Sequence, residues 1–347
     1  MTELFAVALK HYREATGLSQ EELAARAGLD RTYVSQLERA LKSPTLTSIE
    51  KLAQCLGIEP RMLMRDRKGM NTLRVPEDYV VRQVDHVIFV REAHRINIAA
   101  LTLTSAINVA HELIDDMYAV DLDIARTLGM RNLSAFIGEL VAAAIAKTGH
   151  PLFRANPHQD GYPDLLLMDA TGTREWERLE GRQNEKTPFS PFPGGGIEVK
   201  ATCGSVPTPA VFARRRAKKP EIGDTRIGCL VGYDWKAHHR ETNNLLGILW
   251  DFISGRPRIT AMFFSSELVA EDWGAIIHPK EGGGRTTSVS IMTRGGVRKM
   301  YDGWLCVLAN GRYADFLNQR NDGVLIPPRP PGENRDSENP RVLPSPE

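Results

Sequence analysis

Two short strand-like segments that carry acidic residues constrain the fold of this chain more than any other feature. Asp164 directly precedes the apolar run Leu165-Leu166-Leu167-Met168, which predicts a short buried strand. A second strand-like run contains Glu198-Val199-Lys200 and follows three consecutive glycines at 194–196. Alternate side chains of a strand share a face, so Glu198 and Lys200 should point one way and Val199 into the core. Paired with the first segment, the second would bring two carboxylates and an ammonium group together.

Length and composition indicate a chain of two ordinary globular domains. At 347 residues it can bury a sizeable core, and its 25% charged and 42% hydrophobic residues are typical of a water-exposed protein. The formal net charge of +1 means that any surface for nucleic acid must be local. Four cysteines without paired spacing argue against a disulfide framework or a cysteine zinc site: Cys55, Cys203, Cys229 and Cys306. The start has no signal-peptide pattern and residues 98–110 are too short to span a bilayer, so a cytoplasmic protein without a membrane partner is expected.

Residues 1–66 have the pattern of five short helices. The segment Ser19–Glu22 predicts a capping box, in which the serine caps an amide three residues on and the glutamate bonds back. The helix that follows should end at Gly28. Asp30 is then expected to cap a third helix over Arg31–Arg39. Two short helices joined by a tight glycine-containing turn are typical of a helix-turn-helix.

These residues resemble the phage-repressor-like (XRE) helix-turn-helix family, most clearly in three segments: Gly17–Ala24, Val34–Glu38 and Ser43–Leu46. The resemblance implies that the third helix enters the major groove of double-stranded DNA. Its outward side chains are then the expected DNA contacts: Arg31, Thr32, Tyr33, Ser35, Gln36 and Arg39. Glutamine can pair bidentately with adenine and arginine with guanine. The alternative is a protein-interaction module whose polar face is only solvated.

The rest of the chain suggests a linker, a large second domain and a tail. Residues 67–78 change to charged and turn-forming residues, which predicts a linker before a domain over 79–325. The weak alternation of Tyr79–Val90 and the helical period of Ile98–Ala119 are interpreted as a helical lead-in to that domain. Residues 326–347 are rich in proline and charge, which predicts a disordered tail.

An amphipathic helix precedes the two acidic segments, and strand-like runs surround them: Leu133–Lys147 for the helix, Leu152–Ala155 and Arg226–Tyr233 for the further strands. This order resembles the PD-(D/E)XK nuclease superfamily, and within it type II restriction endonucleases, over about 131–235. The residues of the motif are Pro163-Asp164 and Glu198-Val199-Lys200. The expected fold is therefore α+β/α/β, an all-α helix-turn-helix domain followed by a restriction-endonuclease-like mixed β-sheet core flanked by helices.

The resemblance implies a magnesium-dependent, sequence-specific endonuclease that cuts double-stranded DNA and leaves 5′-phosphate and 3′-hydroxyl ends. Asp164 and Glu198 would hold Mg²⁺ together with the Val199 carbonyl oxygen, because this hard cation takes oxygen ligands. Lys200 would orient or help deprotonate the attacking water and stabilise the negative charge of the transition state. No small-molecule cofactor is expected. Cutting both strands needs two active sites, which predicts a homodimer.

Several further residues are candidates for roles around this site. Glu139, on the amphipathic helix, would complete the metal shell or would merely be a surface glutamate. His158 and Gln159 lie just before Asp164 and could touch a phosphate or water, or be exposed turn residues. A basic segment follows the second acidic strand and is expected to contact the DNA backbone, unless it is only a solvated run: Arg214, Arg215, Arg216, Lys218 and Lys219.

Several alternatives stay open from the sequence. Glu198 and Lys200 could form an edge-strand ion pair without catalysis, with Asp164 capping a turn. The long charged stretch Ala170–Pro193 separates the motif halves and would have to loop out between paired strands. Residues 111–115 (His-Glu-Leu-Ile-Asp) begin like a zinc-peptidase helix but lack its second histidine. A transcriptional regulator with a non-catalytic nuclease-like domain and a repair-type nuclease of the same superfamily are the remaining alternatives.

Overall fold

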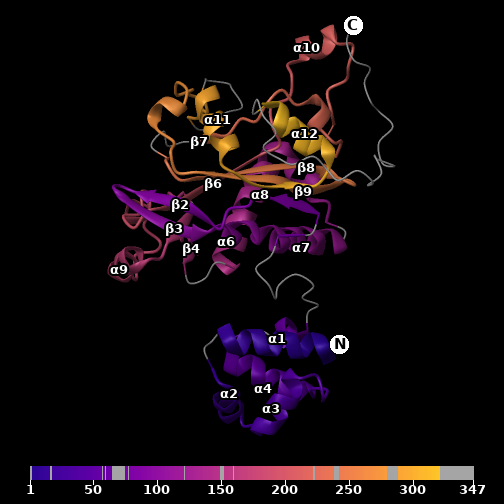
Figure 1. Cartoon of the computed structure of the whole chain (residues 1–347), viewed down its shortest axis with the longest axis vertical. Helices are drawn as coiled ribbons and strands as arrows, with labels where there is room; N and C mark the ends of the chain where they lie inside the picture. Colours follow the sequence, from indigo (N-terminus) through magenta and orange to yellow (C-terminus); the bar gives the residue numbers. More distant parts are fainter. Residues whose placement is uncertain are drawn as a thin grey trace. The chain divides into compact units, whose positions relative to one another are not determined.

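The chain divides into two compact units, Met1–Arg74 and Val75–Glu347 (Figure 1). The computed structural model describes the following residues: 2–15, 18–56, 58, 60–64, 75–76, 78–120, 122–148, 152–158, 160–221, 223–237, 242–279 and 288–320. Most of the predicted linker and the whole of the predicted tail lie outside these residues. In the described part, no single helix is long and apolar enough to cross a membrane, although one pair bent by 107°, Ile124–Met130 with Asn132–Thr148, has the length and composition.

The first unit consists of short helices, as the sequence predicts. Its described helices are α1 (Thr2–Ala15), α2 (Gln20–Ala27), α3 (Arg31–Glu38), α4 (Leu46–Leu56) and α5 (Pro60–Met64). The predicted capping box is present, because the hydroxyl of Ser19 accepts the Glu22 N–H at 3.1 Å and the Glu22 carboxylate accepts the Ser19 N–H at 2.8 Å. Helix α2 ends at Gly28, whose φ of 59° favours glycine. The Asp30 carboxylate accepts the Thr32 N–H at 2.7 Å and begins α3.

A buried ion pair joins the helices of the first unit in addition to their apolar core. Leu23, Val34 and Leu52 are fully buried at its centre. The Arg13 guanidinium donates to Glu38 at 2.6 Å, and Gln20 donates to the same carboxylate at 2.6 Å. Because a buried carboxylate needs its partners, these contacts fix α1, α2 and α3 against one another.

A seven-stranded sheet forms the centre of the second unit. In spatial order its strands are β1 (Tyr79–Val81), β11 (Trp304–Leu308), β9 (Arg256–Ser265), β8 (Leu245–Ile253), β6 (Gly196–Thr202), β5 (Leu165–Leu167) and β4 (Phe153–Ala155). Only β6 and β8 are parallel, and the other neighbouring strands are antiparallel. The sheet is therefore mixed, as predicted.

Helices cover both faces of this sheet (Figure 1). On one face lie α6 (Ala100–Thr104), α7 (Ala106–Ala119) and α8 (Ile124–Thr148), and on the other α11 (Arg294–Asp302) and α12 (Gly311–Arg320). The chain also forms α9 (Ala170–Arg178), α10 (Pro209–Arg214), and the 3₁₀ turns η1 (Thr187–Phe189), η2 (Ile227–Cys229) and η3 (Ala270–Asp272). Two small antiparallel pairs complete the unit: β2 (His86–Arg91) with β3 (His94–Ala99), and β7 (Lys236–Ala237) with β10 (Ser290–Ile291).

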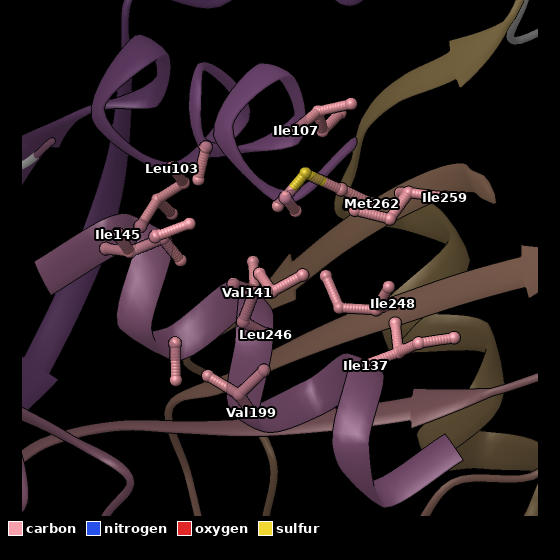
Figure 2. Close-up of a cluster of buried hydrophobic side chains, with 14 of the residues drawn as sticks. Leu103, Ile107, Ile137, Val141, Ile145, Val199, Leu246, Ile248, Ile259 and Met262 are labelled. Carbon is pink, nitrogen blue, oxygen red and sulfur yellow. The ribbon is translucent and has the colours of Figure 1, made fainter. Parts of the chain in front are cut away.

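The sheet separates two hydrophobic cores because its strands alternate their side chains. Leu246 and Ile248 of β8 pack with Val141 of α8 in the larger core, where Val199 of β6 also lies, as predicted (Figure 2). Leu245 belongs instead to the second core, on the opposite face. Since Val199 points toward α8, its neighbours Glu198 and Lys200 belong to the other face of β6.

The prediction of a helical lead-in to the second domain is wrong for the first half of that segment. Tyr79–Val81 forms β1 at the edge of the main sheet, and residues 86–99 form the β2–β3 hairpin, before α6 and α7 begin. One face of the hairpin is buried in the larger core through Val87, Phe89 and Ile98. The alternation that looked weak in the sequence is therefore a true strand pattern.

The neighbour of the second acidic strand also differs from the prediction. The run Arg226–Tyr233, expected to be a strand, contains the 3₁₀ turn η2 instead. The buried Asp251 carboxylate accepts the N–H groups of Arg226 and Ile227 at 3.1 and 3.2 Å, which turns the chain away from a strand. The strand beside β6 is β8, at 245–253, and it lies beyond the predicted core of 131–235.

The long stretch between the motif halves folds rather than looping out freely. Helix α9 begins it, and the Asp169 carboxylate caps α9 by accepting the Gly172 N–H at 2.8 Å. Leu179, Phe189 and Phe192 are buried against Leu166 of β5 in a small core of their own. Strands β5 and β6 can therefore pair directly across this inserted segment.

Candidate functional site

The pairing of β5 with β6 brings the predicted acids and lysine together. Leu165 pairs with Ile197 in antiparallel register, which sets Asp164 beside Glu198. The Asp164 Oδ2 atom accepts the Val199 N–H at 2.7 Å. The Lys200 ammonium lies 2.5 Å from Glu198 Oε1 and 3.4 Å from Asp164 Oδ2. The three side chains named from the sequence thus form one cluster where β6 meets the beginning of β5.

A close approach of the two strands requires glycine next to this cluster. A Cβ atom at Gly196 would lie 1.9 Å from the Leu165 carbonyl oxygen. Any side chain at this position would therefore push β6 away from β5 and separate Asp164 from Glu198. Of the three consecutive glycines before the motif, Gly196 is therefore required because no side chain fits between the two strands.

Burial sets the electrostatics of the cluster. Glu198 is 4% exposed, and this burial raises its pKa, to which Asp164 adds while Lys200 opposes the rise. Burial alone would lower the pKa of Lys200, but the carboxylates of Glu198 and Asp164 outweigh it and raise that pKa above its ordinary value. Lys200 is therefore held as an ammonium group.

The oxygen atoms of the cluster are suited to a hard cation. Glu198 Oε2 is buried and has no hydrogen-bond partner among the described residues. The Lys200 ammonium bridges the two carboxylates, so a cation bound to both would displace it from one of them. In the described part of the chain, no group of three or more His, Cys, Asp or Glu side chains is placed to hold a metal. The fitting donors are therefore Asp164, Glu198 and a backbone oxygen such as that of Val199, the set that Mg²⁺ accepts when it keeps several waters.

Helix α8 carries the third candidate acid close to the cluster. At Gly138 the helix touches β6, where an added Cβ would lie 3.8 Å from the Ala201 Cβ and 4.0 Å from the Val199 carbonyl oxygen. Glu139 follows this contact and is exposed. Partial burial and the nearby Asp164 raise its pKa, while Lys200 opposes the rise. Glu139 therefore interacts electrostatically with Asp164 and Lys200, although it is not buried with them.

His158 belongs to the turn before Asp164. Its N–H donates to Asn156 Oδ1 at 3.0 Å, and its ring Nδ1 accepts the Asp160 N–H at 3.1 Å. These bonds give the half-buried histidine a role in the turn itself. Gln159, the other candidate in this segment, lies outside the described residues.

Two asparagines that the sequence analysis did not single out hold the backbone around the cluster. The Asn244 carbonyl oxygen accepts the Glu198 N–H at 3.0 Å, while its side chain donates to the Val90 carbonyl at 2.7 Å and accepts the Val90 N–H at 2.9 Å. Asn244 thus links the β2–β3 hairpin to the acidic strand. Asn156 holds the turn that contains Asp164. In the sequence, the only signal for these two asparagines is that asparagine is common in turns.

The predicted basic segment is exposed at the end of α10. Arg214, Arg215, Arg216, Lys218 and Lys219 are all exposed, and none of them pairs with an acid of the described chain. Phe212 is buried and anchors the short helix that precedes them. The five cations therefore form a local positive surface on a chain of nearly neutral net charge.

The histidine of the zinc-peptidase alternative has another role. His111 is on α7, and its Nε2 atom accepts the Ile259 N–H at 2.9 Å. Burial and Arg258 lower the pKa of His111 to about 3, with Asp115 opposing them. Asp115 itself is bound by Arg256 at 2.8 Å and by Arg258 at 2.5 Å. The neutral imidazole is a buried acceptor for β9, which leaves this nitrogen unavailable to a metal.

In the first unit, the polar side chains of α3 differ in how far they are exposed. Arg31, Thr32 and Arg39 are exposed, whereas Ser35 and Gln36 are half-buried. Tyr33 is also half-buried, because its hydroxyl bonds to Ser48 of α4 at 3.2 Å and its ring lies under the Lys42 ammonium at 5.1 Å. Five of the six predicted recognition residues lie on α3, whose C-cap is Arg39, and Tyr33 is partly occupied by packing.

Comparisons with known proteins match this first unit. The helix-turn-helix family matches residues 9–63. A Neisseria meningitidis hypothetical transcription factor is 44% identical over 61 residues, 18% of this chain and 58% of that protein. Control protein C.SmaI of Serratia marcescens is 39% identical over 64 residues, 18% of this chain and 76% of that protein, and control protein C.BamHI of Bacillus amyloliquefaciens is 41% identical over 49 residues, 14% and 60% respectively.

A solved structure gives a similar result. The restriction-modification controller protein C.AhdI from Aeromonas hydrophila has 48% sequence identity, with 18% of this chain and 94% of that chain covered and a TM-score of 0.18. This chain spans little more than half of the Neisseria and Bacillus proteins. Through residues 9–63 of its first unit, the chain belongs to the helix-turn-helix family of DNA-binding proteins.

Proposed function

We propose that the chain is a Mg²⁺-dependent endonuclease that cuts double-stranded DNA at specific sites, as type II restriction enzymes do. One observation carries the proposal: Asp164, Glu198 and Lys200 form a single cluster in which one buried carboxylate oxygen, Glu198 Oε2, has no partner in the described chain. A buried, unsatisfied carboxylate oxygen is costly unless a ligand completes it. A divalent cation at this position would supply that partner.

In this mechanism the carboxylates of Asp164 and Glu198, with the Val199 carbonyl, would hold the metal. Bound there, Mg²⁺ would lower the pKa of a coordinated water and neutralise charge on the scissile phosphate. The position of Asp164 is fixed by its bond to the Val199 N–H, so its oxygens are presented in a set direction. Such preorganisation means that little rearrangement is needed when the transition state forms.

Lys200 would act as a charged donor rather than as a base. The raised pKa keeps its ammonium protonated, so it can hydrogen-bond to a phosphate oxygen and to the attacking water. For that role the ammonium would have to give up its present contact with Glu198 Oε1. Hydrolysis of the phosphodiester would leave 5′-phosphate and 3′-hydroxyl ends.

The first unit would deliver sequence preference or gene control. Relatives named as control proteins support a regulatory role for this unit. Gln36 of α3 and Arg39 at its C-cap are proposed above all to contact base edges. The exposed basic segment at the end of α10 would contact the DNA backbone. Two copies of the chain, related by a two-fold axis, would be needed to cut both strands.

The test is cleavage of supercoiled and linear DNA of mixed sequence, unmethylated and methylated, with and without Mg²⁺. We expect discrete fragments that require the metal and disappear in Asp164→Ala and Lys200→Ala. The matched controls are Asp302→Asn and Lys236→Ala, because both residues are exposed and lie away from the cluster in sequence. Cleavage that persists in both active-site variants would contradict the assignment of the site.

A helix-turn-helix regulator with a non-catalytic second unit is the second candidate. The observation that favours it is that the named relatives are regulators or control proteins. This function predicts sequence-specific binding to operator DNA with no cleavage of any substrate in Mg²⁺ or Mn²⁺. Nicking or structure-selective cleavage without sequence preference would favour a repair-type nuclease instead.

A further inference from the structure

Asn156 directly follows the edge strand β4 and hydrogen-bonds to the backbone of Asp164 and of the residue before it. Its N–H donates to the Asp164 carbonyl oxygen at 2.9 Å. Its side-chain Nδ2 donates to the Pro163 carbonyl oxygen at 3.0 Å. Two consecutive carbonyls, of the acid and of the residue before it, are therefore held by one asparagine.

The remaining hydrogen-bonding capacity of this side chain is also used. Nδ2 donates to the Phe189 carbonyl oxygen at 3.0 Å, and Oδ1 accepts the His158 N–H at 3.0 Å. Phe189 is buried in the small core of the inserted segment. Asn156 thus joins the turn before Asp164 to the segment that separates the two halves of the motif.

The space around Asn156 is matched to its amide. A Cβ atom at Gly161 would lie 2.2 Å from Asn156 Oδ1 and 2.4 Å from its Nδ2. Only glycine at 161 lets the amide lie flat against the turn. The hydrogen bonds of the Asn156 amide and the close fit of Gly161 against it both hold the side chain in one orientation.

From these contacts we infer that Asn156 is a positioning residue for Asp164, which sets the direction in which that carboxylate meets a cation. Asp164 is tied to β6 by the Val199 N–H at 2.7 Å and by the Lys200 ammonium at 3.4 Å, and both of these bonds go to Oδ2. Pro163 has no N–H to donate, so its carbonyl oxygen is the one backbone group through which this residue can be anchored. The inference rests on the proposed function only in naming the ligand as a divalent cation.

Replacing Asn156 with aspartate tests this role with almost no change of shape. Asn156→Asp removes both Nδ2 donors and sets a carboxylate oxygen against two carbonyl oxygens. Gly161→Ala displaces the same amide without changing Asn156 itself. Asn310→Asp is the control, because Asn310 is also half-buried and its Oδ1, which accepts the Arg312 N–H at 3.0 Å, is retained by aspartate.

Three measurements on the full chain separate positioning from other roles. We expect the Val199 amide to exchange at least about tenfold faster by NMR in Asn156→Asp and Gly161→Ala, while the other amides of β6 keep their rates. In calorimetric titrations with Mg²⁺ alone, both variants should bind about 10- to 100-fold more weakly than the natural protein, the usual cost of losing a residue that orients a metal ligand. Cleavage in the two variants should then recover in part at higher Mg²⁺ concentration.

An unchanged Val199 exchange rate in either folded variant would overturn the inference. Faster exchange with unchanged Mg²⁺ affinity would also overturn it, because Asn156 would then only join the strands. If Asn156→Asp does not fold, Gly161→Ala carries the same measurements. A natural protein that cuts no DNA would refute the proposed function alone, since amide exchange and Mg²⁺ binding still judge the role of Asn156.

Discussion

Asp164 Oδ2 accepts the backbone N–H of Val199 at 2.7 Å, so an acid of one strand bonds to the backbone of the next. The hydrogen bond takes the place of a ladder bond just before β5 begins and leaves the second oxygen, Oδ1, without a donor in the described chain. Asp164 therefore has two separable functions, one in joining the strands and one in presenting a carboxylate. Substitutions can distinguish them.

Asp164→Asn keeps an acceptor for the Val199 N–H but removes the negative charge. We expect this variant to unfold in urea almost as the natural protein does, while Asp164→Ala loses about 2 kcal/mol more because the buried donor is left unpaired. Both variants should lose Mg²⁺-dependent cleavage and Mg²⁺ binding. An Asp164→Asn protein that still binds Mg²⁺ with normal affinity would show that this carboxylate is not a ligand.

His111 makes the stability of the second unit depend on pH. Its folded pKa of about 3 is below its ordinary value of 6.5, so the unfolded chain binds the proton more tightly. The stabilisation is therefore complete above about pH 6.5 and is lost as the pH falls toward 3. Between pH 7 and pH 5 the free energy of unfolding should fall by about 2 kcal/mol more in the natural protein than in His111→Gln. Equal pH dependence of the two proteins in urea titrations would contradict the assignment.

The basic segment should determine how strongly DNA binding depends on salt. Arg214→Gln with Arg215→Gln should make the plot of log binding constant against log salt concentration shallower, by about 0.9 for each DNA phosphate that the segment no longer neutralises. The matched control is Arg294→Gln with Arg298→Gln on α11, which removes the same charge elsewhere. Measurements by fluorescence anisotropy at about 50 to 200 mM salt would check the slope, and equal slopes in the two double variants would exclude a specific role for the segment.

Gln36 of α3 should contribute to sequence preference rather than to general affinity. Gln36→Ala is expected to weaken binding to the preferred site by about 1 to 3 kcal/mol and to leave binding to unrelated DNA nearly unchanged. Lys51→Ala, at an exposed position of α4, is the control for loss of a polar surface residue. A selection of bound sequences from a random library supplies the site, and an unaltered preference in Gln36→Ala would remove this residue from base recognition.

The first unit was predictable from sequence because its signals are local. Ser19 and Glu22, three residues apart, define the start of α2, and Asp30 defines the start of α3 one residue later. Capping hydrogen bonds form within a few residues, so spacing alone indicates them. The packing of Tyr33 against Ser48 was not predictable, because it depends on how two helices cross.

In the second unit, the local sequence pattern predicted the two acidic strands but not β8, the strand that pairs with β6. Apart from the buried Asp251, the nine residues of β8 are non-polar on both faces, and such a run has no alternation that marks a strand. Its pairing with β6 is parallel and joins residues more than forty positions apart, such as Glu198 and Leu245. Asn156 was missed for a related reason, since the Phe189 carbonyl it bonds is 33 residues away.

The parallel step from β6 to β8 has a consequence for how such a protein could change its target. Parallel neighbours cannot be joined by a tight turn, so the chain must leave the end of β6 and travel back to the start of β8. That return path, residues 203–244, includes α10 and the five exposed cations. Ile227, Tyr233 and Trp235 of this path are buried in the second core, whereas its five cations are exposed. We therefore expect substitution of these exposed cations to change the charge that this surface offers to a partner without disturbing the strand that carries Glu198 and Lys200.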